Sequence, residues 1–217
     1  LDFFKKKKSF LFEIKNKDKL TKYNPLNLEN TNDIFYIDGN FESEKYFLDY
    51  RNNLLNEFSF KNLLKDNKYL KVINNHNVVS VCVRQNRFSE RPNNKLDINA
   101  INKSNQFVTD TVDYIYRSIE FIKTKVDNPI FLLWSNDFTD LDKYFPINEF
   151  QYVINKDNKI LNDFFLLTQC KYFIVAPSTF HWWGAWLSNF ENKICIRPKN
   201  LNPSNNQDFW PEKWISI

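Results

Sequence analysis

Three polar segments of the sequence carry side chains suited to holding a diphosphate and a nucleoside. They follow three apolar runs and contain Arg84, Asp137, and Ser178 with Thr179. An arginine guanidinium can bind two phosphate oxygens at once. A hydroxyl at the start of a helix, together with the free backbone N–H groups there, attracts anions. The carboxylate of Asp137 can accept two hydrogen bonds, as from N1–H and the amino group of guanine or from two ribose hydroxyls.

Each of these residues also has a structural interpretation. Arg84 alone is compatible with a surface ion pair, Asp137 with a cap of the next helix, and Ser178 with a helix N-cap. Their occurrence at three successive strand ends favours a binding site, because the carboxyl ends of parallel strands lie along one edge of a sheet.

The elements that position these residues alternate in type. Strands are predicted at residues 33–37, 78–83, 130–134, 149–154, 172–176 and 193–196. Helices are predicted at 42–64, 107–125, 159–169 and 179–187, and the polar stretch 84–105 is expected to be a long loop. This alternation is typical of an α/β fold with a parallel sheet flanked by helices.

Composition excludes several classes of protein. Of the 217 residues, 42% are hydrophobic and 18% aromatic, which is enough apolar mass to exclude a disordered chain. No apolar run is long enough to predict a membrane span. The two glycines, Gly39 and Gly184, cannot form a glycine-rich nucleotide loop. Three cysteines without a CxxC pair argue against a disulfide framework and a zinc cluster, so we expect a soluble cytoplasmic protein.

The charge is nearly balanced, with 30 Lys and Arg against 26 Asp and Glu. The basic run Lys5–Lys8 is the one feature that points to nucleic acid, and it lies among phenylalanines typical of a strand edge or helix face. No clustered basic and aromatic motif accompanies it, so we expect no nucleic-acid partner. The chain begins at Leu1 and contains no methionine, from which we expect that its natural start is missing.

Three blocks of the sequence resemble one enzyme family. Residues 176–187, Ala-Pro-Ser-Thr-Phe-His-Trp-Trp-Gly-Ala-Trp-Leu, resemble the Ser-Thr-Phe-Ser-Trp-Trp-Gly-Ala-Trp-Leu block of the α-1,2-fucosyltransferases, glycosyltransferase family 11. Residues 38–47 resemble the family's Asp-Gly-Tyr-Phe-Gln-Ser-Glu-Lys-Tyr-Phe segment, and residues 134–137 its Phe-Ser-Asp-Asp. The blocks follow in the family's order, so the resemblance covers the chain from about Asp33 onward.

One block departs from the family. Cys82, Arg84, Gln85 and Arg87 stand where the family's His-x-Arg-Arg-Gly-Asp motif has His, Arg, Arg and Asp. The retained first arginine implies that Arg84 holds the β-phosphate and is the catalytic residue. The resemblance implies substrate-binding roles for five further residues, namely Cys82, Asp137, Ser178, Thr179 and Phe180. The altered motif leaves a second interpretation open, a degenerate member that binds nucleotide-sugar or glycan without turnover.

The resemblance also implies a fold and a reaction. The fold is GT-B, with residues 1–70 a remnant of the N-terminal, acceptor-side domain and the linking helix. Residues 71–217 are then the donor-binding domain, built on a Rossmann-type parallel sheet. The reaction is the inverting transfer of fucose from GDP-fucose to the 2-hydroxyl of a galactose in a glycan. A cytoplasmic location follows, with at most peripheral membrane association.

No cofactor or metal is expected beyond the GDP-fucose substrate. Arg84 and the helix start at Ser178 and Thr179 are suited to stabilise the charge that develops on the leaving GDP. The sequence Asp140-Leu141-Asp142 matches the DxD of metal-dependent transferases. It falls at a predicted helix start, where aspartate is favoured in any case.

Other residues of these blocks have open roles. Asp38, Glu42 or a residue outside the chain are the candidates for the general base. His181 is compatible with a ligand contact, but packing against tryptophan on a helix face is the favoured interpretation. The three tryptophans of the same block are interpreted as structural: Trp182, Trp183 and Trp186.

Overall fold

The structure is a computed structural model of the chain. It describes residues 8–15, 19–26, 28, 34–59, 64, 66–155, 160–202, 204 and 206–217. These residues pack as two compact units, the first within Leu1–Asn52 and Asn202–Lys213, the second within Asn53–Leu201 and Trp214–Ile217. In the described part of the chain, no helix combines the length and apolarity that a membrane span requires.

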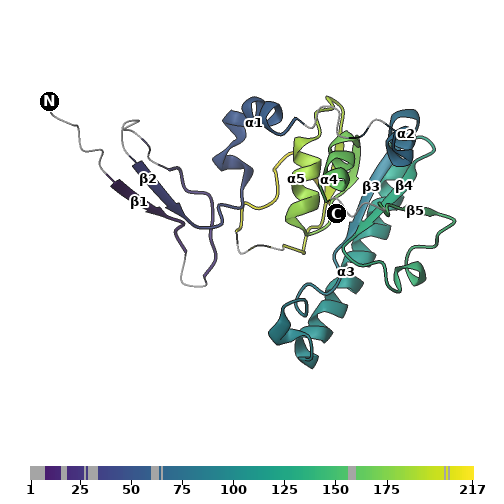
Figure 1. Ribbon diagram of the computed structural model, residues 1–217, viewed down its shortest axis with the longest axis horizontal. Coiled ribbons are helices and arrows are strands. Elements are labelled where there is room, and N and C mark those ends of the chain that lie inside the picture. Colours follow the sequence, from purple (N-terminus) through teal and green to yellow (C-terminus); the bar gives the residue numbers. More distant parts are fainter. Residues whose placement is uncertain are drawn as a thin grey trace. The chain divides into compact units, whose positions relative to one another are not determined.

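The second unit is built on a sheet of six parallel strands (Figure 1). The strands are β3 (Val78–Val83), β4 (Ile130–Ser135), β5 (Phe150–Tyr152), β6 (Tyr172–Ile174), β7 (Ile194–Arg197) and β8 (Ile215–Ser216). Their order is β5-β4-β3-β6-β7-β8, and every neighbouring pair is parallel. The chain therefore builds outward from β3, returns to β6 beside it and builds outward the other way. This order confirms the predicted α/β class and is that of a Rossmann-type sheet.

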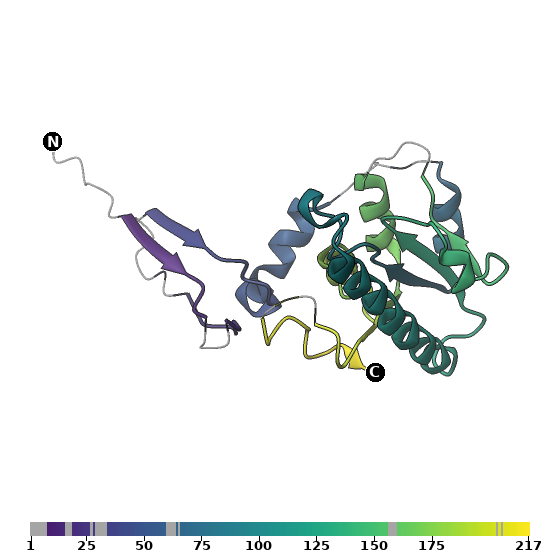
Figure 2. The same cartoon turned by 90° about the horizontal axis from the view of Figure 1, so that it is seen from below.

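Helices cover both faces of this sheet. Alternate β3 residues, Val79 and Val81, pack into the apolar core with the 26-residue helix α3 (Ile98–Lys123). Ser80 points the other way and contacts His181 of α5 (Thr179–Leu187). The helices α4 (Ile160–Gln169) and α2 (Lys68–Asn75) pack on the α5 side. Figure 2 shows α3 in front of the strands. A strand buried on both faces explains the nearly continuous apolar run of β3.

The predicted long loop 84–105 is wrong in its second half. The loop ends at Asp97, whose side chain accepts a hydrogen bond from Asn99 N at 2.9 Å and caps α3 at Ile98. A short 3-10 turn, Pro92–Asn94, interrupts the loop. The helix therefore begins nine residues before the predicted Phe107, because the Asp97 cap starts turns in which only the small side chains of Ala100 and Ser104 are buried.

The predicted helix 42–64 is also wrong in part. Two 3-10 turns, Glu44–Tyr46 and Leu48–Tyr50, precede the short helix α1 (Arg51–Glu57). Phe47 separates the two turns with a φ of −140°, which no α-helix accommodates. Residues 60–63 of the predicted helix lie outside the described residues.

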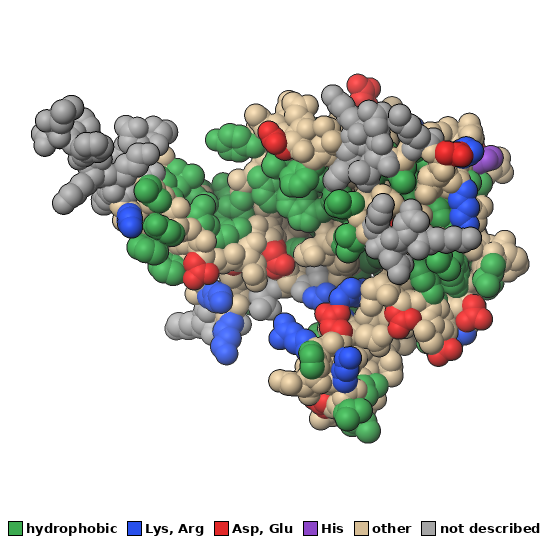
Figure 3. All heavy atoms as spheres, in the orientation of Figure 1, with side chains coloured by type: hydrophobic (Ala, Val, Ile, Leu, Met, Phe, Trp, Pro, Cys, Tyr) green, Lys and Arg blue, Asp and Glu red, His purple; other side chains and the backbone are tan. Residues whose placement is uncertain are grey.

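The first unit contains a two-stranded parallel ribbon of β1 (Lys8–Phe12) and β2 (Ile34–Asp38), which confirms the described part of the strand predicted at 33–37. Phe10 stacks on Tyr36 with ring centroids 4.9 Å apart, and both side chains are exposed. Figure 3 shows apolar side chains on the surface of this ribbon. Lys5, Lys6 and Lys7 of the basic run lie outside the described residues.

A segment near the chain's end, residues 202–213, completes the first unit. Lys45 Nζ lies 2.8 Å from Asp208 Oδ1, and Tyr23 N donates to Asp208 Oδ2 at 2.7 Å. Gln207 N donates to the carbonyl of Thr21 at 2.9 Å. Hydrogen bonds between residues more than 160 positions apart in the sequence thus hold this unit together.

Candidate functional site

A cavity of about 540 Å³ lies where the strands of the second unit end. It is bordered by the carboxyl ends of β3, β4 and β5 and by the first turns of α4 and α5. Beside it, β3 meets β6, the point at which the direction of the chain across the sheet reverses. Ligands of open parallel sheets bind at such a point. The lining residues are Cys82, Val83, Arg84, Trp134, Ser135, Asn136, Phe138, Val153, Ile154, Asn155, Ile160, Asp163, Ser178 and Phe180.

Arg84 brings a positive charge to this cavity from the end of β3. Its guanidinium pairs with the carboxylate of Glu90. Arg84 lines the cavity and Glu90 does not. The loop folds Glu90 back through Asn86, whose φ is 56° and whose carbonyl accepts from Glu90 N at 2.8 Å. The arginine is thus already held in place without a ligand.

Cys82 forms part of the wall beside Arg84. The side chain is buried, and burial raises the pKa of its thiol to about 12. The thiol is therefore protonated at neutral pH and acts as a small apolar surface rather than as a nucleophile.

The start of α5 supplies the groups expected to bind an anion. Ser178 is the N-cap residue, with extended backbone, yet its hydroxyl makes no cap hydrogen bond. Ser178 and Phe180 line the cavity, whereas Thr179 is exposed and does not. A hydroxyl not used as a cap, next to the N–H groups of the first helical turn, suits a phosphate oxygen.

Asp137 lies beside the cavity but not in its lining. Its Oδ1 accepts from Thr139 N at 2.9 Å and its Oδ2 from Asn86 Nδ2 at 3.2 Å. These hydrogen bonds, those from Thr139 first, lower the pKa of the carboxyl. The structure therefore brings Cys82, Arg84, Ser178 and Phe180 together and leaves Asp137 and Thr179 outside the lining.

Reciprocal hydrogen bonds between Gln85 and Asn136 join the loops that follow β3 and β4. Gln85 N donates to Asn136 Oδ1 at 2.8 Å, and Asn136 Nδ2 donates to the Gln85 carbonyl at 3.2 Å. The Gln85 side chain adds hydrogen bonds to the carbonyls of Asp137, at 2.8 Å, and Thr139, at 3.0 Å. Gln85, where the resembling motif has a second arginine, therefore fixes the β3 and β4 loops relative to each other.

Asp163 is a site residue that the sequence analysis missed. It lies in the first turn of α4, lines the cavity and accepts a hydrogen bond from Asn155 Nδ2. Burial raises the pKa of its carboxyl. The only indication in the sequence is that Asp163 lies in the first turns of the helix predicted at 159–169. An aspartate there is also explained by its favourable interaction with the helix dipole.

Trp134 is a second missed residue. It pairs in register with Cys82 on the neighbouring strand, lines the cavity and is 3% exposed. The sequence does not indicate this role, because a single tryptophan in an apolar strand is usually a core residue.

His181 is fully buried between α5 and β3. Nδ1 accepts from Ala176 N at 3.0 Å, so the proton lies on Nε2, which is 2.8 Å from Ser80 Oγ. Burial lowers the pKa of the imidazole to about 3, which keeps it neutral at ordinary pH. His181 does not line the cavity, so it ties α5 to β3 rather than contacting a ligand.

The tryptophans of α5 are packing residues. Trp182 and Trp186 are buried and stack with ring centroids 6.1 Å apart and an 8° angle between planes. Trp183 is half-buried against both. Their predicted structural interpretation agrees with this burial.

The DxD-like segment forms a turn. Asp140, with a φ of 56°, precedes the 3-10 turn Leu141–Lys143. Across the residues that the structure describes, no three His, Cys, Asp or Glu side chains gather as a metal site would require.

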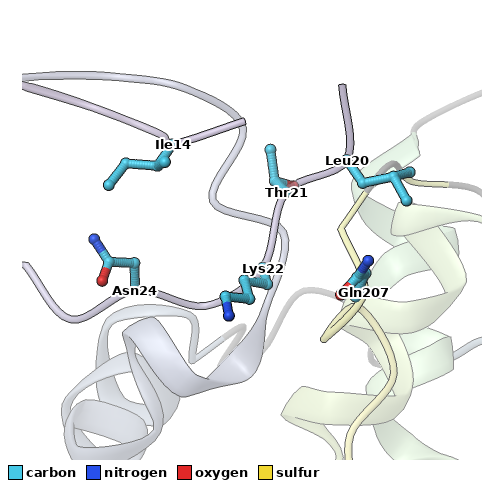
Figure 4. Close-up of a pocket in the computed structure, with 6 residues that line it drawn as sticks. All are labelled: Ile14, Leu20, Thr21, Lys22, Asn24 and Gln207. Carbon is cyan, nitrogen blue, oxygen red and sulfur yellow. The ribbon is translucent and has the colours of Figure 1, made fainter. Parts of the chain in front are cut away.

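The first unit has a smaller cavity, of about 290 Å³, shown in Figure 4. Its lining is Ile14, Leu20, Thr21, Lys22, Asn24 and Gln207, with one charged side chain and no arginine. The two candidate bases lie in the same unit: Asp38 ends β2, and Glu42 accepts a hydrogen bond from Ser204 Oγ. This cavity offers a lysine instead of an arginine, and its one hydroxyl side chain, Thr21, does not lie at the start of a helix.

Comparisons with known proteins agree with the geometry. The model of Glycosyl transferase family 11 matches residues 13–217. An alpha-1,2-colitosyltransferase of Escherichia coli is 32% identical over 189 residues, which cover 82% of this chain and 61% of that protein. The O-antigen biosynthesis glycosyltransferase WbnK of Escherichia coli is 31% identical over 109 residues, 49% of this chain and 36% of that protein. No solved structure matches.

The chain thus spans about three fifths of the length of the colitosyltransferase. The family match extends over both compact units and includes every lining residue of the larger cavity. The chain belongs to glycosyltransferase family 11.

Proposed function

We propose that the protein transfers fucose from GDP-fucose to the 2-hydroxyl of a galactose in a glycan, with inversion at the anomeric carbon. The observation that carries the proposal is the cavity beside β3 and β6, in which Arg84 and Ser178 of a family 11 chain meet. Residues 71–217, which include the six-stranded sheet of the second unit, are assigned to the donor-binding domain of a GT-B enzyme. Residues 1–70 are assigned to the acceptor side and the linking helix.

The donor's diphosphate is assigned to the β3 and β6 end of the cavity. Arg84 offers a fixed guanidinium, and Ser178 offers a hydroxyl at the N-terminus of the nine-residue helix α5. Both groups can donate hydrogen bonds to negatively charged phosphate oxygens. The apolar walls at Phe138 and Ile160, farther along the same edge, suit a planar base.

The chemical step breaks the bond between the anomeric carbon of fucose and the β-phosphate oxygen, and the electron pair leaves with GDP. The acceptor 2-hydroxyl oxygen forms the new bond from the opposite face and gives its proton to a general base. Charge grows on the β-phosphate as the bond breaks, so Arg84 and the α5 N–H groups stabilise the transition state more than the bound donor. This assignment requires no metal ion.

The acceptor side of the proposal rests on fewer observations. Asp38 and Glu42 stay the candidate bases, and both belong to the first unit. The galactose-containing glycan is proposed from the family membership alone. A cytoplasmic location, at most at the membrane periphery, is part of the same proposal.

Two alternatives differ in donor or in turnover. The 32% identity with an alpha-1,2-colitosyltransferase favours colitose as the second candidate sugar. The altered segment Cys82–Arg87 supports a protein that binds the nucleotide-sugar without transferring it. Asp38→Asn and Glu42→Gln variants separate a missing base from a missing donor site, because neither residue lies in the donor cavity.

The test is a transfer assay with the protein, GDP-fucose and a galactose-terminated oligosaccharide, with EDTA present. The expected product is an α-1,2-linked fucoside, identified by NMR, and free GDP in equal amount. GDP-colitose in place of GDP-fucose decides the donor sugar. Binding of GDP without any product from either donor would leave the degenerate alternative standing.

A further inference from the structure

The buried indole nitrogen of Trp134 has no hydrogen-bond partner among the residues that the structure describes. The side chain is 3% exposed and lines the larger cavity. A polar N–H that is buried and unpaired destabilises the folded protein, because it loses its hydrogen bond to water. Most buried polar groups in proteins are paired, so an unpaired donor on a side chain that lines a cavity points to an acceptor on a ligand.

The position of Trp134 along the sheet indicates which part of a ligand it meets. From β6 toward β5, the edge presents Ser178, then Arg84, then Trp134, and then Asn155 after β5. The phosphate-binding groups therefore lie at the β6 and β3 end. Trp134 lies one strand farther on, with Asp163 of α4 in the same cavity wall.

We propose that Trp134 Nε1–H donates a hydrogen bond to O6 of the guanine base of the donor and thereby selects guanine over adenine. The inference rests on the proposed function, because it assigns the base to the cavity that holds the diphosphate. Guanine presents one acceptor, O6, beside two donors, N1–H and the 2-amino group. The N–H of Trp134 and the carboxylate of Asp163 supply one donor and one acceptor group to match them.

Adenine reverses this pattern at the decisive position. Its 6-amino group is a donor where guanine has O6, so Trp134 would stay unpaired and meet a second donor. A site built to pair a polar group rejects an analogue that lacks the partner. Trp134 stands where the resembling family segment has phenylalanine, so the hydrogen bond is a feature of this chain.

The test is Trp134→Phe, which keeps an aromatic ring and removes the N–H. Binding of GDP, IDP and ADP is measured by calorimetry, and the free energy of unfolding without ligand by urea titration. We expect GDP and IDP, which both carry O6, to bind about tenfold more weakly. ADP binding is expected to be unchanged or tighter, and the unliganded protein equally stable or more stable.

The control is Trp186→Phe, which removes another buried indole that does not line the cavity. Unchanged GDP binding by Trp134→Phe, or an equal loss for ADP, would overturn the inference while leaving GDP binding by the unaltered protein intact. Failure of the unaltered protein to bind GDP is a different result, and it would contradict the proposed function together with this inference.

Discussion

His181 Nε2 lies 2.8 Å from Ser80 Oγ, inside the contact between α5 and β3. The same ring accepts a hydrogen bond from Ala176 N at 3.0 Å. One neutral imidazole thus joins β3, the end of β6 and the helix that begins at the larger cavity. Positions of the cavity groups on β3 and α5 therefore depend on His181 staying uncharged.

Acid is expected to destabilise the protein through His181. Burial lowers the pKa of the folded-state imidazole to about 3, from the ordinary 6.5. The unfolded chain therefore binds the proton first as the pH falls below 6.5, and stability present above that pH is lost progressively toward 3. The loss between pH 7 and pH 5 is about 2 kcal/mol.

Urea unfolding at these two pH values measures the loss. His76, the other histidine, is exposed, so His76→Asn is the control and keeps the full pH dependence. The variant His181→Gln, if folded, is expected to lose most of the pH dependence of the free energy of unfolding. The interpretation fails if His76→Asn, rather than His181→Gln, flattens the profile.

Gly184 is expected to tolerate no side chain, because α4 and α5 touch there. A Cβ on Gly184 would lie 2.7 Å from the Cβ of Leu167, closer than carbon atoms approach in proteins. Gly184→Ala should lower the free energy of unfolding by about 1–3 kcal/mol, as overpacked cores do. The same substitution in a Leu167→Ala background should destabilise less. Equal effects in the two backgrounds would contradict the assigned contact.

Glu90 is expected to act as a positioning residue for Arg84. Its carboxylate pairs with the guanidinium and does not line the cavity. Glu90→Gln removes the charge that orients Arg84, and GDP binding should weaken by about two- to fivefold, the range of a partly exposed ion pair. In an Arg84→Ala background the same substitution should change nothing. Equal GDP binding by Glu90→Gln would contradict the positioning role. Tighter binding would show that the carboxylate competes with phosphate for Arg84.

Asp163 is expected to discriminate the 2-amino group of guanine. IDP lacks that group and is otherwise identical to GDP. Unaltered protein should prefer GDP over IDP, and Asp163→Asn should reduce the preference by about tenfold, since hydrogen bonds to a charged acceptor are the stronger ones. Competition calorimetry with the two nucleotides measures the ratio. An unchanged ratio in Asp163→Asn would place the base elsewhere.

Much of the fold was predictable from the sequence because β3 and β4 are buried on both faces. Burial on both faces requires nearly continuous apolar runs, and Val78–Val83 was located to the residue. The start of α3 was not predictable from periodicity, because its first turns bury only the small side chains of Ala100 and Ser104, and the Asp97 cap is what marks them.

The candidate site was predictable only where residues leave strands directly. Arg84 and Ser178 follow β3 and β6, and the parallel sheet brings them to one edge. Asp163 reaches the same cavity from a helix that follows a different strand, and Trp134 reaches it from within a strand. The sequence does not show that Asp163 and Trp134 reach the cavity, because this depends on how α4 packs over the sheet.

Binding of GDP to the unaltered protein and to Arg84→Ala, measured by calorimetry with EDTA present, tests the account most directly. Arg117→Ala, which removes an exposed arginine paired with Asp113 on α3, is the matched control. The account predicts selective GDP binding over ADP and UDP, retained in Arg117→Ala and weakened at least about tenfold in Arg84→Ala. Equal GDP binding by all three proteins would contradict the assignment of the donor diphosphate to the cavity beside β3 and β6.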